Sequence, residues 1–575
     1  MGPRPIVLLS ACALLCASIP LSGAGDVAAA ADSSAGAGNS NRSEPEDRPG
    51  SANWRWSESG RFYPGDQRSV PEPRSFDRIV PTSQETIVPG LVHSQYDDGV
   101  VEADVLQADL TEPTLSVGYV APDSVAAREP LNVQATESGT VAATNGDFFD
   151  INDSGAPRGA GIADGELRHA PAEGWNEGVV FSQQDDGNTG RLANILLDAV
   201  ATLPSGETVS IDNLNSPNVA SDGIGIYTSE WGSTARSRAV DGADSVREVQ
   251  IEQGVVTAVR TSAGADPVPS DGLVLLGRDG GATELGDVRT GDEIEVEYRA
   301  DYEGAEAHTG ITGNTTLLRD GDVVAPEHPR HPRTGVGFSA DGRTMWLVAL
   351  DGRSDASTGM TLVEFAEFLR SLGADDALNL DGGGSTTMVA MMPGDTELSV
   401  QNSPSDGSQR PVPNGLGFTS TAYPPDCVRA SLDGPDYETI GAGDSGDLVL
   451  VAECLLLAAG FGEGTPDVEF DSATTGAVQE FQADRGIAVD GSVNAATWTA
   501  LLSAGATPSL QDGSNGLAVK RAQRALNAAI QAGLSVDGVF GADTEAAVRE
   551  YQEGRGLAAD GIVGPDTWEA LQHGR

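Results

Sequence analysis

The chain has 575 residues, a formal net charge of −52 and a pI of about 4.2, so it is long enough for several domains and at least one large core. Aromatic residues make up 5% of it and hydrophobic residues 39%, with 72 glycines, a composition that suits a loop-rich secreted protein better than a helical bundle. The excess of negative charge argues against nucleic acid as a partner, because nothing in the chain neutralises a run of phosphates.

Residues 1–31 have the pattern of a signal peptide. Arg4 precedes an apolar run from Ile6 to Leu21, and small residues follow up to Ala31, after which we expect cleavage. Residues 9–12 resemble a lipobox and leave a lipoprotein alternative open, although few apolar residues precede them. No other segment is long and apolar enough to span a membrane. The mature protein is therefore expected outside a bacterial cell, without a transmembrane segment.

Two of the four cysteines, Cys12 and Cys16, leave with the signal peptide. The remaining pair, Cys427 and Cys454, is expected to form a disulfide in an oxidising exterior. Two cysteines and six scattered histidines argue against a zinc site. We expect neither a metal nor a cofactor.

The composition changes along the mature chain. Residues 32–84 are rich in Ser, Gly, Pro and charge, which predicts a disordered linker. Residues 85–423 alternate apolar runs with Gly, Asp and Asn turns, which predicts a sheet-rich, mixed α+β domain. One helix is expected inside it, because Thr361 and Glu364 form a capping box and Gly373 is placed to end the apolar stripe between them.

The last part of the chain is a tandem repeat with a spacing of 70 positions, as in the pairs Thr474/Thr544 and Trp498/Trp568. It predicts two small all-α modules of three helices, residues 427–505 and 509–575, each with Asp-Gly turns around a small core. Both modules resemble the peptidoglycan-binding domain of bacterial wall enzymes, which implies cell-wall association. The first copy departs from this pattern and leaves open whether both copies bind the wall.

A strand–helix–strand unit is predicted around the capped helix. TMWLVAL ends at Leu350 and is followed by Asp351, and DALNL is followed by Asp381. A unit of this length favours neighbouring parallel strands, which places both aspartates at one edge of the sheet. Three glycines, Gly382, Gly383 and Gly384, follow Asp381, and such a loop exposes backbone N–H groups that form a nest for an anion.

Further polar residues are candidates for the same site. Two of them, Asn145 and Asp147, lie in TNGDFFD, and three arginines, Arg333, Arg353 and Arg410, are candidate anion ligands. Carboxylates and arginines without a reactive thiol or a serine in a nucleophile-elbow context suit acid/base chemistry on a sugar that has an anionic neighbour.

These motifs in this order resemble the phosphodiester glycosidases, a family that includes the enzyme that uncovers mannose phosphate by removing N-acetylglucosamine. The resemblance rests on Asn145-Gly146 with Phe148-Phe149, Arg333-Thr334 with Gly337, Asp351-Gly352, the start of the capped helix, and NLDGGGS. It implies hydrolysis of a sugar-1-phosphodiester at the anomeric carbon. Asp147 departs from the second glycine of the animal NGGFF pattern, which leaves the substrate open.

On this basis Asp381 is predicted to be the nucleophile or base and Asp351 its partner. The three arginines are predicted to hold the phosphate, and Asn145 and Asp147 the sugar hydroxyls. Structural alternatives remain for each: Asp351-Gly352 is also a common turn, and the arginines also suit pairing with surplus carboxylates. The segment from Asp150 to Gly155 resembles half of a calcium loop but lacks a Glu at the twelfth position.

Two other classes of function stay open. One is a peptidoglycan-binding wall protein without turnover, and the other is a peptidoglycan amidase or peptidase, for which the zinc-ligand spacing is missing.

Overall fold

The computed structural model describes residues 80–575 except 185–186, 305, 393–396, 424–426, 429–431, 433–436, 463 and 506. The predicted signal peptide and nearly all of the predicted linker lie outside the described residues. The first strand begins at Ser83, two residues before the predicted start of the domain. No helix in the described part of the chain is long and apolar enough to cross a membrane.

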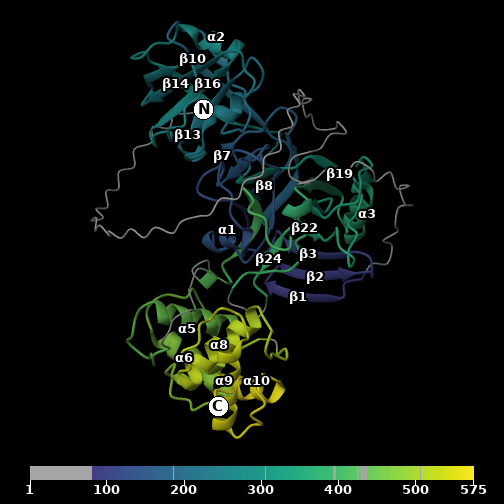
Figure 1. Ribbon diagram of the computed structural model, residues 1–575, viewed down its shortest axis with the longest axis vertical. Coiled ribbons are helices and arrows are strands. Elements are labelled where there is room, and N and C mark those ends of the chain that lie inside the picture. The colour runs from purple at the N-terminus through teal and green to yellow at the C-terminus, as the bar shows by residue number, and fades with distance from the viewer. Residues whose placement is uncertain are drawn as a thin grey trace, which may run out of the picture. The chain divides into compact units, whose positions relative to one another are not determined.

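An eight-stranded sheet is the largest element of the fold, and its neighbouring strands pair antiparallel. Figure 1 shows β1, β2 and β3 side by side at one end of it. In spatial order its strands are β1 (Ser83–Val88), β2 (Leu91–Asp97), β3 (Glu102–Asp109), β22 (Thr344–Leu350), β21 (Arg333–Phe338), β23 (Asp376–Leu380), β19 (Thr315–Arg319) and β20 (Asp322–Val323).

The helix α3 (Leu362–Leu372) covers one face of this sheet. It forms the predicted capping box, in which Thr361 and Glu364 exchange hydrogen bonds of 3.1 and 3.0 Å, and it ends at Gly373 with φ 109°. The helix packs closely on strand β21 because this strand contains glycines. A Cβ on Gly335 would lie 2.7 Å from the Phe365 ring, so any larger residue would displace α3.

Two further sheets complete the core. Their inner residues form one apolar cluster with those of the large sheet and with the short helix α1 (Leu131–Glu137). The first of these sheets has the strand order β25 (Ser399–Val400), β24 (Met388–Ala390), β5 (Ala142–Asn145), β26 (Gly415–Ser420) and β4 (Leu115–Val120). The second has the strand order β7 (Glu166–His169), β6 (Gly161–Ala163), β18 (Thr309–Thr312), β8 (Glu177–Gln184) and β9 (Gly187–Asn194).

Residues 196–301 form two more sheets between β9 and β18 in chain order, with apolar clusters largely of their own. This includes the stretch from Val240 to Tyr298, which no sequence motif explains. One sheet of this region contains β10 (Leu196–Thr202), β11 (Thr208–Ser210) and β17 (Glu295–Asp301). The other contains β12 (Asn213–Leu214), β13 (Ile224–Thr228), β16 (Gly272–Arg278), β14 (Val246–Glu252) and β15 (Val255–Arg260). The region also contains the helix α2 (Gly280–Glu284) and the 3-10 turns η1 (Ser229–Trp231), η2 (Arg236–Val240) and η3 (Leu285–Asp287).

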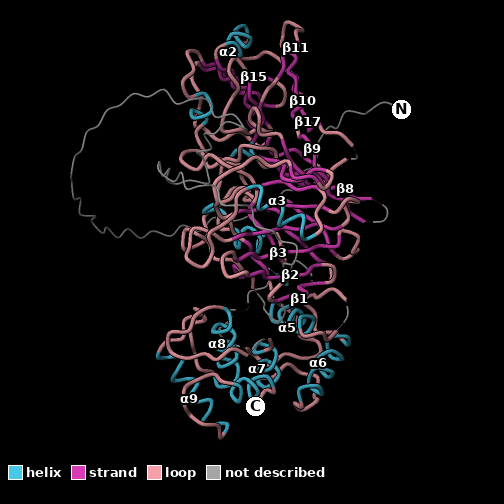
Figure 2. The backbone as a smooth tube through the Cα atoms, turned by 90° about the vertical axis from the view of Figure 1, so that its right-hand side faces the viewer, coloured by secondary structure: helices cyan, strands magenta, loops and turns pink. Residues whose placement is uncertain are grey.

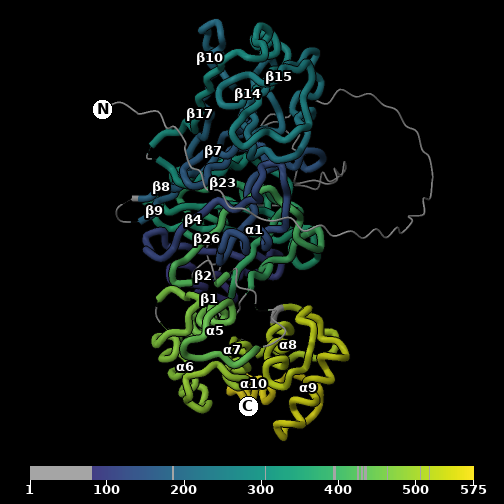
Figure 3. The backbone as a smooth tube through the Cα atoms, turned by 90° about the vertical axis from the view of Figure 1, so that its left-hand side faces the viewer, coloured from purple at the N-terminus to yellow at the C-terminus, as the bar shows by residue number. Residues whose placement is uncertain are grey.

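Strands give way to helices after Ser420, as Figure 2 shows. The described helices are α5 (Asp447–Ala458), α6 (Ser472–Arg485), α7 (Ala495–Ser503), α8 (Leu517–Ile530), α9 (Ala542–Arg555) and α10 (Pro565–Gln572). The α+β class, with a sheet-rich part followed by small helical modules, is confirmed. The two modules share one apolar cluster, and α7 of the first packs on α8 of the second (Figure 3). The expected disulfide between Cys427 and Cys454 is present.

The residues that the repeats share hold core and turn positions. Trp498 and Trp568 are fully buried, and their indole N–H groups donate to equivalent carbonyls of Glu438 and Pro508. The amide of Gln552 donates to Asp560 of the following Asp-Gly turn and accepts from the Gly561 N–H, and Gln482 does the same in the first copy. These residues therefore stabilise the modules from inside.

The first copy departs from the second at one turn and at the residue that holds this turn. In the second module Gln523 closes the turn by accepting from the Gly538 N–H (3.0 Å). The first module has Val468 in place of that glycine and Glu453 in place of the glutamine, and Glu453 accepts instead from the Asp467 N–H (2.7 Å). The turn is thus held by a carboxylate in one module and by an amide in the other.

Candidate active site

The two predicted catalytic aspartates follow strands that end at the same edge of the eight-stranded sheet. Both strands are antiparallel to β21, which pairs Arg333 with Leu350 of β22 and Thr334 with Leu380 of β23. The expectation that β22 and β23 are neighbours is wrong, because the segment HPRTGVG supplies β21 between them. Their common direction is confirmed. Since adjacent strands lie about 4.8 Å apart, the backbones of Asp351 and Asp381 are separated by about 10 Å.

The backbone of Asp381 is fixed by the loop that follows β5. Asp381 is fully buried; its N–H donates to the Gly146 carbonyl (2.8 Å) and its carbonyl accepts from Asn145 Nδ2 (2.7 Å). Gly146 is needed for this approach, since a Cβ there would lie 2.3 Å from Ile311 and 2.7 Å from the Asn414 side chain. The TNGDFFD motif therefore meets the DGGGS motif directly.

Asn145 is a positioning residue in this arrangement. Besides its bond to Asp381, its Oδ1 accepts from the Thr387 N–H (3.0 Å) and from the Thr334 hydroxyl (3.0 Å). It is fully buried. These contacts explain the motif without a ligand, so the predicted binding of sugar hydroxyls by Asn145 stays a prediction.

Asp147 is a second buried carboxyl group beside Asp381. Its Oδ2 accepts from the Gly159 N–H (2.8 Å) and from the Thr312 hydroxyl (3.3 Å). Burial raises the pKa of Asp147 well above its ordinary range, and the negative charge of Asp381 raises it further. The structure thus brings Asp147 to the site, in a setting that favours its protonated form.

A closed ring of hydrogen bonds surrounds Asp147. The Asp147 N–H donates to Asn414 Oδ1 (2.8 Å), and Asn414 Nδ2 donates to the Tyr119 oxygen (2.8 Å). Tyr119 bonds His169 Nε2 (2.7 Å), and His169 Nδ1 bonds the carbonyl of Gly159 (2.8 Å), whose N–H returns to Asp147. We call these five residues the Asp147 ring.

Sequence reasoning did not find Tyr119, His169, Asn414, Gly159 or Thr312. The one local signal was the pair of glycines in RGAG. A Cβ on Gly159 would lie 1.4 Å from Thr312 Oγ1, which is a close approach of the kind that demands glycine. The partners come from strands and loops far apart in the sequence, and no spacing rule connects them.

Asp351 is buried on the other side of β21. It accepts from Asn402 Nδ2 (2.9 Å) and from the Ser403 N–H (2.9 and 3.0 Å). Burial raises its pKa to about 6; the bonds from Asn402 and Ser403 act against this, and the charges of Asp104 and Glu102 add to it. Sequence reasoning missed Asn402, which also donates to the Thr386 carbonyl (3.2 Å) and so links Asp351 to the DGGGS loop.

The triple-glycine loop lies against Arg410. Gly383 has φ 62°, and its N–H donates to the Pro332 carbonyl (2.9 Å) within the 3-10 turn η4 (Gly383–Ser385), so one amide of the predicted nest bonds the protein. A Cβ on Gly384 would lie 2.0 Å from Arg410 Nη2. Arg410 also donates to the Ser385 hydroxyl (3.2 Å) and to Asp406 (2.7 Å). The structure therefore brings Arg410 to the loop.

The other two arginines lie where β21 begins and β22 ends. Arg333 is buried and donates to the carbonyls of Met360 (3.1 Å) and Pro329 (2.7 Å), which anchors the loop before β21. Arg353 is exposed, bonds His331 Nδ1 (3.3 Å) and has φ 62°, a strained conformation of the kind that occurs at functional sites.

The described residues contain no group of three or more His, Cys, Asp or Glu side chains that could hold a metal ion. The segment from Asp150 to Gly155, which resembles half of a calcium loop, forms a turn that Asp150 caps. Oδ2 of Asp150 accepts from the Ser154 N–H (3.1 Å) and hydroxyl (2.9 Å).

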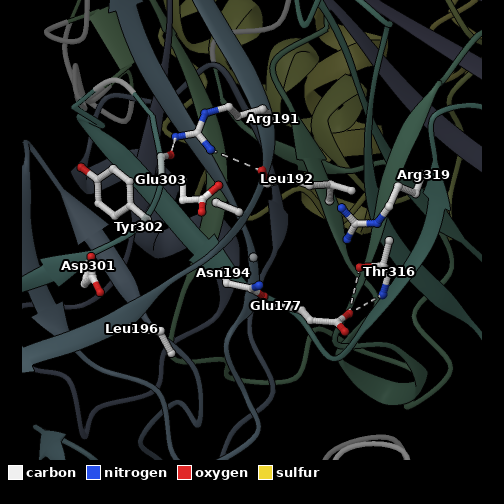
Figure 4. A pocket seen from close by; sticks show the side chains of 12 residues that line it. Glu177, Arg191, Leu192, Asn194, Leu196, Asp301, Tyr302, Glu303, Thr316 and Arg319 are labelled. Carbon is white, nitrogen blue, oxygen red and sulfur yellow. Dashed lines mark hydrogen bonds between the residues drawn. The ribbon is translucent and has the colours of Figure 1, made fainter.

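A cavity of about 430 Å³ opens elsewhere, between β8, β9, β17 and β19. Figure 4 shows Arg191 and Arg319 on its wall, and Glu177 accepting hydrogen bonds from Thr316 (2.7 and 2.9 Å). None of the predicted site residues lines this cavity, so it is separate from the site at the sheet edge.

The fold and site define a sheet-rich protein with buried carboxylates beside an arginine-bordered glycine loop. Residues 245–419 match the phosphodiester glycosidase family model, and residues 445–501 and 515–571 each match the peptidoglycan binding domain model. The chain thus contains a phosphodiester glycosidase domain and two C-terminal peptidoglycan-binding domains. The two peptidoglycan-binding matches repeat the 70-residue spacing of the sequence.

Individual proteins are similar to parts of this chain. The prophage-derived protein YomE of Bacillus subtilis is 35% identical over 97 residues, which are 17% of this chain and 14% of that protein. A crystal structure of a Synechocystis protein has a TM-score of 0.50 at 24% identity, covering 59% of this chain and 64% of that one, and shares the fold. The zebrafish N-acetylglucosamine-1-phosphodiester alpha-N-acetylglucosaminidase catalytic domain matches with a TM-score of 0.29 at 18% identity, over 64% of this chain and 86% of that one.

Proposed function

We propose that this protein is a secreted, wall-associated hydrolase that cleaves sugar-1-phosphodiester bonds at the anomeric carbon of wall or capsular phosphoglycans, with N-acetylglucosamine-1-phosphodiesters as the model substrate. The observation that carries the proposal is the pair of buried carboxyl groups, Asp381 and Asp147, next to a glycine loop that Arg410 borders. The phosphodiester glycosidase match supports the reaction class.

The chemistry follows from the leaving group. A phosphate monoester is a weak base, so its departure depends more on charge stabilisation than on protonation. Asp381 attacks the anomeric carbon or activates a water there, the bond from that carbon to the phosphate oxygen breaks, and its electron pair leaves with the phosphate. Water supplies the hydroxyl group of the released sugar.

The other residues have supporting roles in this proposal. Arg410 donates paired hydrogen bonds to the phosphate, with Arg353 and Arg333 as further cationic groups at the edge. Asp351, as a carboxylate, stabilises the oxocarbenium-like state. Since its pKa is about 6, this role requires a pH above that value.

The peptidoglycan-binding matches favour one alternative, a wall-binding protein without turnover. In that case the DGGGS loop only binds phosphate, and Asp381→Asn leaves ligand binding intact. A peptidoglycan hydrolase without phosphodiester glycosidase activity is the related alternative, and it predicts release of wall peptides or sugars.

The deciding experiment incubates the mature protein with an N-acetylglucosamine-1-phosphodiester in oxygen-18 water. Label in the released sugar, absent with Asp381→Asn, establishes cleavage at the anomeric carbon. Label in the phosphate means cleavage of the P–O bond and contradicts the proposal. An enzyme that is inactive on this substrate and on teichoic and capsular phosphodiesters is the wall-binding alternative.

A further inference from the structure

The cavity between β8, β9, β17 and β19 has no part in the proposed reaction, yet its size suits a ligand. Its volume is about 430 Å³, within the range of about 300–1,000 Å³ that small-molecule pockets have. Its wall combines cationic, anionic, amide and apolar side chains from strands that lie far apart in the sequence (Figure 4). These side chains define the chemistry of the ligand that the cavity can hold.

Two arginines on the wall form no ion pair with a described carboxylate. Arg319, the last residue of β19, is exposed and makes neither a hydrogen bond nor an ion pair with any residue that the structure describes. Figure 4 shows its guanidinium group turned into the cavity. Arg191 donates to the backbone carbonyls of Leu192 (3.4 Å) and Glu303. Since acidic residues outnumber basic ones by 86 to 34 in this chain and arginine pairs readily with carboxylates, these two arginines are placed for an anionic group of a ligand.

Carboxylates on the same wall disfavour a bare inorganic anion as that ligand. Glu177, Asp301 and Glu303 line the cavity together with the arginines, and their negative charge repels free phosphate or sulfate. Glu177 is held in place, because its Oε2 accepts from the N–H (2.7 Å) and the hydroxyl (2.9 Å) of Thr316. Its Oε1 has no hydrogen-bond partner among the described residues. A carboxylate oxygen accepts from hydroxyl groups, so the ligand should contain hydroxyl groups as well as an anionic group.

The remaining wall also suits a sugar ring. Oδ1 of Asn194 accepts from Asn176 Nδ2 (3.3 Å), while Nδ2 of Asn194 donates to no residue in the described part of the chain. Leu196 is 45% exposed and lies on the same wall. Ligand pockets typically combine such apolar surface with a few placed polar groups, and a sugar ring presents both C–H and O–H groups to them.

A short segment connects the cavity to the candidate active site. The Thr312 hydroxyl donates to Asp147 (3.3 Å), the Gly313 N–H donates to the Glu177 carbonyl (2.9 Å), and Thr316 bonds the Glu177 side chain. Four residues of chain span at most about 14 Å, so the Cα atoms of Thr312 and Thr316 lie no further apart than this. One glycan chain is therefore long enough to reach both places.

We propose that this cavity is a second glycan-binding site, which holds a sugar unit with an anionic group while another part of the same glycan occupies the site at Asp381. Arg319 and Arg191 bind the anionic group, and Glu177 and Asn194 bind hydroxyl groups. Sugar carboxylates and sugar phosphates share this chemistry. The supply of the sugar by the substrate rests on the proposed function, whereas binding in the cavity does not require hydrolysis.

The first test measures binding to the full chain by isothermal titration calorimetry. The probes are glucuronate and glucose 6-phosphate, with glucose and inorganic phosphate for comparison. At least one of the two anionic sugars is expected to bind tighter than both comparison probes, and the tighter of the two identifies the anionic group. Arg319→Ala is expected to weaken this binding by roughly tenfold, the effect of losing a charge-assisted hydrogen bond.

Two variants locate the binding. Arg299→Ala is the matched control, because Arg299 also lies on the cavity-forming strand β17 but pairs with Asp198 (2.6 Å), and it should leave the affinity in place. Arg410→Ala should do the same, because Arg410 borders the other site. The proposal is wrong if neither anionic sugar binds, if glucose or phosphate binds equally well, or if Arg410→Ala and not Arg319→Ala removes the binding. Thermal melting checks that each variant folds.

The second test connects the cavity to hydrolysis. Arg319→Ala is expected to raise KM for an acidic capsular phosphoglycan at least fivefold more than KM for a short N-acetylglucosamine-1-phosphodiester, because only the longer chain reaches the cavity. Equal effects on the two substrates overturn the shared glycan. A protein that binds an anionic sugar through Arg319 but hydrolyses no phosphodiester contradicts only the proposed function, and one that hydrolyses them without such binding contradicts only this inference.

Discussion

The side-chain amide of Asn145 donates a 2.7 Å hydrogen bond to the carbonyl oxygen of Asp381, joining the end of β5 to the end of β23. The two residues lie 236 positions apart in the chain. The phosphodiester glycosidase match begins at residue 245 and so contains Asp381 but not Asn145 or Asp147. The candidate site therefore depends on residues well before the matched range.

Replacing Asn145 is expected to weaken both stability and activity. Asn145→Ala removes one donor from the Asp381 carbonyl and one acceptor from Thr387 and Thr334. Buried groups left without partners lower the free energy of unfolding by about 3 kcal/mol. Because Asp381 loses its anchor, kcat should fall more than KM rises.

Urea denaturation and steady-state kinetics check this prediction. Asn132→Ala is the control, since the half-buried Asn132 side chain accepts one bond from Gln409 (3.0 Å), and it should leave kcat in place. An Asn145→Ala variant with normal kcat and a raised KM would instead assign Asn145 to sugar binding.

The pKa of Asp351 predicts an acidic limit to activity. If Asp351 acts as a carboxylate, kcat/KM rises as the pH increases through about 6. Asn402→Ala removes a donor that stabilises the charged form, so the acidic limb should move to higher pH, and Asp351→Asn should abolish it. A limb that stays in place in Asn402→Ala would exclude Asp351 as its source.

The same group also links stability to pH. Its pKa rises from an ordinary 3.8 to about 6 on folding, so the folded state binds the proton more tightly. The resulting stabilisation is complete below about pH 4 and is lost as the pH increases through about 6. Asp351→Asn should remove this dependence, which melting curves across that window would show.

Local patterns predicted the parts of the fold that depend on neighbouring residues. The capping box of Thr361 and Glu364, the end of α3 at Gly373 and the repeated helical modules all follow from short-range rules. The common edge of Asp351 and Asp381 was also predicted. The place of β21 between them was not, because a single sequence does not show that the strand beginning at Arg333 pairs with both β22 and β23.

The chemistry of Asp147 could not be read from its motif. Its environment comes from Tyr119 on β4, His169 on β7 and Asn414 before β26, and a single sequence contains no signal for such long-range pairs. For the arginines, by contrast, the sequence contained a signal, but the structure shows other partners. Their residue type suggested anion binding, but Arg333 donates to backbone carbonyls, which only the three-dimensional arrangement reveals.

Arg410 should control recognition of the phosphate rather than of the sugar. Arg410→Ala removes charge-assisted hydrogen bonds, each of about 1.5–3 kcal/mol, so KM for a sugar-1-phosphodiester should increase by roughly tenfold or more. Gly384→Ala should act in the same direction, because its Cβ would displace Arg410.

A neutral aryl glycoside of the same sugar separates the two contributions and should be hydrolysed equally well by Arg410→Ala and wild type. Arg370→Ala is the control, since that arginine pairs with Glu367 on the exposed face of α3. Equal losses on both substrates would assign Arg410 to the structure of the loop.

The disulfide between Cys427 and Cys454 should stabilise the segment that follows the last strand. It joins residues 27 positions apart, and closing a loop of this length in the unfolded chain contributes about 3–4 kcal/mol. The double variant with Cys427→Ser and Cys454→Ser should therefore unfold at lower urea concentration, and a reductant should shift wild type by the same amount. The reductant should have no effect on the variant. Because neither cysteine lies at the sheet edge that carries Asp351 and Asp381, hydrolysis below the unfolding transition should be unchanged; a loss of kcat in the folded double variant would contradict this separation of site and disulfide.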